Sequence, residues 1–204
     1  MPDAKYSMTF ATGGLLYRES LVVADLYGEL GDWDAVKDRI LSANLLQIRT
    51  PSGARRIYQE VSLRLMRLTP DEMALLRRGS RQEQCYLLWL AVCKRYRFVH
   101  DFAVEVLREK FLGWDLLLTY EDYDLFFNNK AEWHPEVGRA APSTRKKQRQ
   151  LLFRMVREAG LLSQDNRILP ALLTPRLGEI MARESPAYLT VFPLSDPDIS
   201  EWLP

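Results

Sequence analysis

Seven helix-start signals are spread along this chain, and they constrain its fold more than any other feature. Each is a Ser, Thr or Asp whose side-chain oxygen can accept a hydrogen bond from the backbone N–H groups that begin a helix. The seven residues are Asp32, Ser52, Thr69, Ser80, Thr119, Ser143 and Thr174. Alternation of apolar and polar residues, which is typical of half-buried strands, is nearly absent. We therefore predict a compact all-α protein, with residues 188–192 as the best strand candidate.

The segment between Ser80 and Tyr96 is the most apolar in the chain. Ser80 and Glu83 have the spacing of a capping box, and residues 86–93 are apolar almost all round a helix. This pattern predicts a central buried helix. No Gly/Ser-rich or Pro-rich linker interrupts the chain on either side of it. We expect an N-terminal helical unit (residues 1–68), central connecting helices (69–96) and a C-terminal helical unit (97–204) joined in one body.

Residues 139–157 form a strongly basic stretch. It contains seven Lys or Arg residues and no acidic residue, and Pro142 and Gly160 are placed to begin and end a helix. Apolar residues recur at helical spacing from its C-terminal half to just beyond its end, namely Leu151, Leu152, Met155, Val156 and Ala159. Residues 144–150 are polar and cationic throughout. A helix anchored by one end, with a basic and amide-rich other end, suits insertion into the major groove of a duplex. The alternative is an ordinary solvated basic face.

A second basic helix is expected earlier, from residue 51 to about residue 68. Two shorter helices precede it, and Ser52, Arg55, Gln59 and neighbouring Arg56 lie away from its apolar stripe. Two short helices followed by a longer one with exposed Arg, Gln and Ser is the order of a helix-turn-helix unit. Many three-helix bundles share this order.

A turn signal at residues 164–167 separates two short apolar segments directly after the basic stretch. This pattern predicts a hairpin between residues 161 and 169, which could be the wing of a winged helix-turn-helix. The strand candidate at residues 188–192 is a potential pairing partner for it.

The composition argues against several classes of protein. A net charge of +1 favours localised basic patches over a uniformly basic surface. Cys85 and Cys93 are expected to be buried thiols in a reducing cytoplasm, and His100 and His134 each stand alone as structural residues. No phosphate-binding glycine loop, nucleophile motif or metal-ligand spacing is present. We therefore expect neither enzyme activity, nor a cofactor, nor a metal, nor a secretion signal or membrane span.

Three strings then carry a family resemblance: TGGLLYRES from Thr12, GDWDAVKDRIL from Gly31, and LLQIRTPSGARRIYQEVSLRL from Leu45. They are similar to the BrxA family, small accessory proteins of the bacteriophage-exclusion (BREX) systems of bacteria. The resemblance is most specific over residues 12–68 and continues to the C-terminus. It implies an all-helical, non-enzymatic protein with two helix-turn-helix units that binds double-stranded DNA.

Our first hypothesis is therefore a cytoplasmic double-stranded DNA-binding protein that works with other BREX proteins. The alternatives are an adaptor whose basic patches dock on an acidic protein, and an RNA-binding helical bundle. Basic residues would contact phosphates, while amide and hydroxyl side chains would approach base edges. The predicted phosphate contacts are Arg55, Arg56, Arg145, Lys146, Lys147 and Arg149. The predicted base-reading residues are Ser52, Gln59, Thr144 and Gln148.

Overall fold

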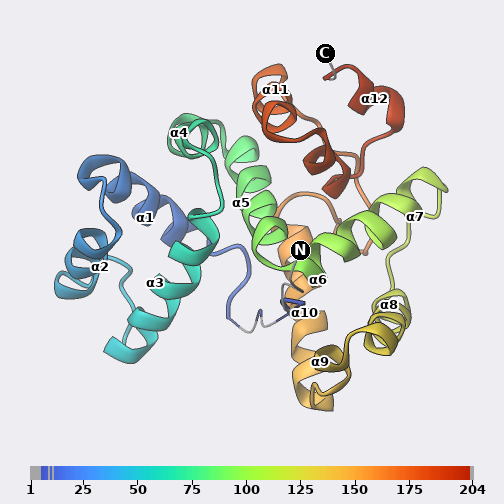
Figure 1. Cartoon of the computed structure of the whole chain (residues 1–204), viewed down its shortest axis with the longest axis horizontal. Helices are drawn as coiled ribbons and strands as arrows, with labels where there is room; N and C mark the ends of the chain where they lie inside the picture. The colour runs from blue at the N-terminus through green and yellow to red at the C-terminus, as the bar shows by residue number, and fades with distance from the viewer. Residues whose placement is uncertain (1–5, 9, 11, 203–204) are drawn as a thin grey trace.

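The computed structural model describes residues 6–8, 10 and 12–202, and in this part of the chain the protein is all-α with no named strand (Figure 1). In the N-terminal half the helices are α1 (Tyr17–Leu30), α2 (Trp33–Ser42), α3 (Pro51–Leu65), α4 (Pro70–Arg78) and α5 (Arg81–Arg95). Next come α6 (Arg97–Phe102), the π-helical η1 (Ala103–Arg108), α7 (Glu109–Leu112) and α8 (Tyr120–Trp133). The last are α9 (Pro135–Gly138), α10 (Pro142–Glu158), α11 (Pro175–Glu184), the 3-10 helix η2 (Pro186–Val191) and α12 (Asp196–Ser200). No helix among the described residues is both long and apolar enough to cross a membrane.

Five of the seven predicted N-caps are confirmed, namely those at Asp32, Thr69, Ser80, Thr119 and Thr174. The caps predicted at Ser52 and Ser143 are wrong, because each of these helices begins earlier than such a cap requires, at a proline. Thr50 caps α3, and α10 has Ala141 at its N-cap position with no side-chain hydrogen bond. Proline lacks an N–H and favours an extended residue before it, so it takes the first helical position.

The predicted central helix is confirmed as α5. All residues from 85 to 93 are buried, and α5 packs against α3, α4, α6 and α10 (Figure 1). The indole N–H of Trp89 donates to the Val191 carbonyl at 2.9 Å, which ties the C-terminal part of the chain to the same helix. A helix buried on all sides has no amphipathic stripe, as the sequence indicated.

The predicted turn after the basic stretch is present as a short chain reversal. Leu162 and Ile168 form an isolated antiparallel bridge across it, and a second bridge joins Leu117 to Arg167. The strand predicted at residues 188–192 is wrong, since most of this segment lies in η2. The segment preceding α8, and not residues 188–192, pairs with the turn. A β-prone sequence without a neighbouring strand to pair with does not stay extended.

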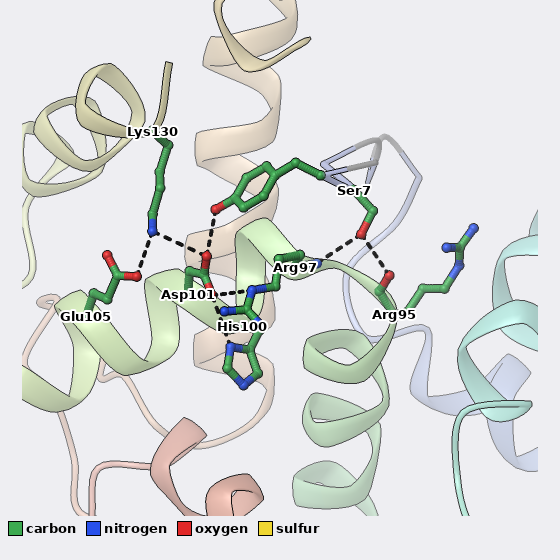
Figure 2. A network of polar contacts seen from close by, with 8 residues as sticks. Ser7, Arg95, Arg97, His100, Asp101, Glu105 and Lys130 are labelled. Carbon is green, nitrogen blue, oxygen red and sulfur yellow. Dashed lines mark hydrogen bonds and ion pairs between the residues drawn. The ribbon is translucent and has the colours of Figure 1, made fainter. Parts of the chain in front are cut away.

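An N-terminal segment, residues 6–16, links several helices. Residues 9 and 11 of this segment lie outside the described part of the chain, and so do residues 1–5, the start of the predicted N-terminal unit. Ser7 Oγ donates to the Arg95 carbonyl and accepts from the Arg97 N–H, as Figure 2 shows. The Tyr6 hydroxyl donates to Asp101 at 3.0 Å. The N-terminal segment is thereby fastened to the junction of α5 and α6.

Asp101 is the centre of this polar network (Figure 2). Its buried carboxylate also faces Arg97 at 2.7 Å, Lys130 at 3.3 Å and His100 Nδ1 at 3.2 Å. Burial alone would raise the pKa of Asp101, but the His100 hydrogen bond and the charges of Lys130 and Arg97 outweigh it and lower that pKa. The carboxylate is therefore held ionised, and it joins the N-terminal segment, α6 and α8.

Candidate nucleic-acid interface

Helix α10 is anchored by its C-terminal half. Four residues of the predicted apolar stripe are buried and Leu151 is half-buried, and Phe153, which the prediction omitted, is fully buried beside them. The Phe153 ring packs edge-on against Tyr120 of α8, with ring centroids 4.8 Å apart. The first two turns of α10 carry exposed Ser143, Thr144, Lys146 and Lys147.

Arg145 and Arg149 lie on the side of α10 that faces α8. Arg145 Nε donates to Asp124 Oδ1 at 3.0 Å, and its NH1 donates to Asn128 Oδ1 at 2.9 Å. Arg149 donates to the other oxygen of Asp124. The guanidinium groups also lie over the rings of Phe127 and Tyr120, at 4.4 and 4.3 Å from the ring centroids. These two arginines join α10 to α8 and share one carboxylate.

Lys146 and Lys147 have a different environment. Both are exposed, and neither makes an ion pair or a side-chain hydrogen bond with the residues that the structure describes. No carboxylate of the described chain therefore competes with an external anion for either ammonium group. They are the cations of the first turns of α10 that face solvent.

Gln148 lies between these two groups and points inward. Its side chain is buried, with 2% of its surface exposed, and Nε2 donates to the Met8 carbonyl at 2.6 Å. In this position the amide cannot reach a base edge, contrary to the role that the sequence suggested for it. It fastens α10 to the N-terminal segment, whereas Thr144 remains exposed.

Helix α3 also exposes its first turns. Ser52, Arg55, Arg56 and Gln59 are all exposed, while the opposite face buries residues such as Tyr58, whose hydroxyl donates to the Trp33 carbonyl at 2.6 Å. Neither Arg55 nor Arg56 has an ion-pair partner in the described part of the chain.

A groove of about 210 Å³ lies between the end of α2 and the start of α3. Arg49 and Arg55 line it together with Asn44. Arg49 is exposed and was not selected from the sequence, although it begins a run of five arginines opposed by one acidic residue between positions 49 and 67. The groove adds a third cation beside the first turn of α3.

The turn at Gly14 and Leu15 in the N-terminal segment contacts both α3 and α10 and fixes their relative positions. Arg64 of α3 donates to the Gly14 carbonyl at 2.8 Å, and the Leu15 N–H donates to Glu158 of α10 at 2.6 Å. Both helices also pack against α5, and in Figure 1 their N-terminal ends run toward the lower edge of the view. The two sets of exposed cations are therefore fixed relative to one another by buried contacts.

The interface residues offer cations, hydroxyls and amides, and no group with the surroundings of a nucleophile or general base. The two histidines lie elsewhere, and both have structural partners. His100 contacts Asp101, and the His134 ring stacks on Tyr6 with centroids 3.9 Å apart. This arrangement can bind an anionic surface through charge and hydrogen bonding.

Known proteins of one family are similar to this chain over most of its length. The family model named BrxA matches residues 4–185. The BREX protein BrxA of Escherichia coli O9:H4 (strain HS) is 28% identical over 155 residues, which are 76% of this chain and 73% of that protein. The BREX protein BrxA of Bacillus cereus (strain H3081.97) is 28% identical over 157 residues, 77% of this chain and 78% of that protein. A crystal structure of an uncharacterized protein from Magnetospirillum magneticum has the same fold, with a TM-score of 0.78, 21% identity, and coverage of 92% of this chain and 97% of that one.

Proposed function

The chain belongs to the BrxA family of the BREX phage-defence systems, and from this premise we propose that it is a non-enzymatic accessory protein that binds double-stranded DNA. DNA would contact the exposed first turns of α10 and α3. Other proteins of the BREX system would be its partners in the cell.

The observation that carries this proposal is the division of the cations on α10. Arg145 and Arg149 share the single carboxylate of Asp124, whereas Lys146 and Lys147 face solvent without a carboxylate in the described chain. Unpaired cations at the exposed start of a helix attract phosphates, and they release counterions from DNA on binding. An ordinary solvated helix would intersperse acidic side chains among such cations, and residues 139–157 contain none.

The order of elements around α10 supports a winged helix-turn-helix. The continuous helical stretch α6–η1–α7 comes first, followed by the short segment at Leu117, α8, the one-turn α9, α10 and the turn that bridges Leu162 to Ile168. In this arrangement α10 would be the recognition helix, and the exposed Arg167 at the turn would contact the DNA backbone.

The N-terminal unit supports a second contact. Helices α1, α2 and α3 pack on one another, and α3 presents Arg55 and Arg56 at its exposed first turns. Because α3 and α10 are tied to the same turn of the N-terminal segment, one duplex could bind both. Ser52, Gln59 and Thr144 would then be the side chains that approach base edges.

Charge reversal tests the proposal. We expect Lys146→Glu with Lys147→Glu to weaken binding of a duplex, measured by fluorescence anisotropy over a salt series, and to reduce the salt slope by about 0.9 for each phosphate that the variant no longer neutralises. Arg55→Glu with Arg56→Glu should weaken it less. The matched control is Arg67→Glu with Arg78→Glu, which changes the net charge equally at exposed positions outside both helix starts.

Three outcomes would contradict the proposal. A folded quadruple variant that binds duplex as tightly as the parent would show that both basic surfaces are merely solvated. Equal weakening by the control pair would show that only net charge matters. Tighter binding to single-stranded RNA or to an acidic protein than to duplex would favour the alternative functions.

A further inference from the structure

Trp114 is an unusual residue in the loop between α7 and α8. Its side chain is 86% exposed, and its backbone has φ +56°, in the left-handed region that bulky residues rarely occupy. The left-handed conformation ends α7, since the Asp115 N–H donates to the Lys110 carbonyl at 3.0 Å, but this role does not require a tryptophan, and an exposed tryptophan gains nothing from burial. Neither the packing of the chain nor the proposed DNA contact accounts for this side chain.

An apolar pocket of about 440 Å³ lies next to Trp114. Its other lining residues come from three segments that are distant in sequence: Phe111, Leu112 and Leu116; Ile168 and Pro170; and Ser195. This volume lies in the range of sites that accept a large side chain or a small ligand. We call the pocket and the Trp114 side chain the Trp114 site.

The charges around the Trp114 site are arranged with carboxylates outside and cations inside. Asp115 is 64% exposed at its side chain, whereas its partner Lys110 is 16% exposed. Asp196 is 83% exposed, whereas its partner Arg108 is 9% exposed. Glu109 is exposed as well. Asp115 and Asp196 directly follow the pocket residues Trp114 and Ser195 in the chain, and their side chains are more exposed than the cations that pair with them, which is the opposite polarity to that of α10.

The backbone at Leu117 is also turned toward solvent. The flanking N–H groups are paired across the turn, Leu118 with the Asn166 carbonyl at 2.9 Å and Ile168 with the Leu116 carbonyl at 2.7 Å. The C=O of Leu117 makes no backbone hydrogen bond among the described residues, its N–H is engaged by the Asp115 carboxylate, and its side chain is 50% exposed. In an antiparallel pair this geometry directs both groups to the open edge.

We propose that the Trp114 site is the docking site for an extended segment of another protein that carries a large apolar side chain flanked by Lys or Arg. The apolar side chain enters the pocket against Trp114, the cations meet Asp115 and Asp196, and a backbone N–H of the extended segment donates to the Leu117 carbonyl. This is the chemistry of strand addition, in which backbone bonds supply affinity and a pocket supplies specificity. Tryptophan is enriched among the interface residues that carry most of the binding energy.

The test uses the full-length protein and a displayed library of random peptides of about 12 residues, followed by anisotropy with labelled synthetic copies of the enriched sequences. We expect enrichment of peptides with an aromatic or large aliphatic residue between basic ones. Trp114→Gly should weaken their binding at least about tenfold. Glycine accepts a positive φ without strain, so this variant should fold at least as well as the parent.

Trp133→Ala is the matched control, because Trp133 is 82% exposed but lies at the end of α8. We expect it to leave peptide binding unchanged, and raising salt from about 0.05 to 0.5 M to weaken peptide binding through screening. Trp114→Gly should leave duplex binding unchanged.

Each contrary outcome overturns the proposal. Enriched peptides that are acidic or lack an apolar anchor, or that bind Trp114→Gly as well as the parent, would remove the assigned occupant. A dimer that depends on Trp114 in size-exclusion chromatography with light scattering would identify a second copy as the occupant. Loss of duplex affinity in Trp114→Gly would assign the site to the DNA interface.

Discussion

Asp124→Asn is the substitution that most directly tests how the cations of α10 are divided. The Asp124 carboxylate accepts from both Arg145 and Arg149, and the amide that replaces it keeps the same shape but carries no charge. The change should loosen the junction of α8 and α10 and, at the same time, release two guanidinium groups beside Lys146 and Lys147. Stability and DNA affinity are therefore expected to change in opposite directions.

The expected loss of stability is small. The side chains of Asp124, Arg145 and Arg149 are 33%, 28% and 20% exposed, so each ion pair is partly screened by solvent. Such pairs contribute about 0.5–1 kcal/mol each. Arg145 keeps its bond to Asn128, and both guanidinium groups keep their contacts with aromatic rings. We expect the free energy of unfolding to fall by about 1 kcal/mol, measured by urea titration.

The expected gain in DNA affinity follows from counterion release. Each additional phosphate contact steepens the plot of log affinity against log salt by about 0.9, which corresponds to about eightfold tighter binding at 0.1 M salt. If one released arginine reaches the duplex, anisotropy should show about that gain. The control is Asp71→Asn, which makes the same change in net charge at an exposed ion pair with Arg183 on another surface.

The reasoning would be refuted by a salt slope and affinity unchanged from the parent in Asp124→Asn. It would also be refuted if Asp71→Asn increased affinity equally, since net charge alone would then explain the effect. Weaker binding by a folded Asp124→Asn would show that the carboxylate positions α10 for DNA, and that positioning outweighs the charge that it neutralises.

Three further predictions concern buried polar groups. Lys94→Met should lower the free energy of unfolding, measured by urea titration, by about 3–5 kcal/mol. The substitution leaves the buried Glu72 carboxylate, which lies 2.7 Å from the Lys94 ammonium group, without its partner. A loss below about 1 kcal/mol would contradict this prediction. Gln148→Ala should cost about 2 kcal/mol of stability but leave duplex affinity unchanged in the folded protein, and a loss of affinity would restore a DNA role for this residue. Burial would raise the pKa of Glu83, but hydrogen bonds led by the Thr174 hydroxyl hold it at about 2. The pKa of Glu83 in the folded protein therefore lies below its value of about 4.3 in the unfolded chain. Its contribution to the free energy of unfolding is full above about pH 4.3 and is lost as the pH falls toward 2. The stability gap between the parent and Glu83→Gln should therefore narrow from pH 6 to pH 3 in urea titrations, and a constant gap would contradict it.

Local chemistry alone determined most of the helices. A cap such as Thr69 or Thr119, and an apolar run such as residues 85–93, act within a few residues of themselves, so the chain reveals them without its fold. The same local rules, applied with the proline preference for the first helical position, would also have placed the starts of α3 and α10 correctly. The family resemblance at residues 12–68 was likewise readable from the sequence.

The tertiary structure decided which residues of the basic stretch are available. Lys146 and Arg145 are neighbours of similar charge, yet one faces solvent and the other contacts Asp124, which lies 21 residues away in the sequence. Gln148 is buried because the N-terminal segment, 140 residues away, presents the Met8 carbonyl to it. Helical periodicity gives the direction in which a side chain points around the axis of its helix. It does not give which other element of the fold lies in that direction. Burial and pairing depend on that second element, and its position is a property of the whole fold.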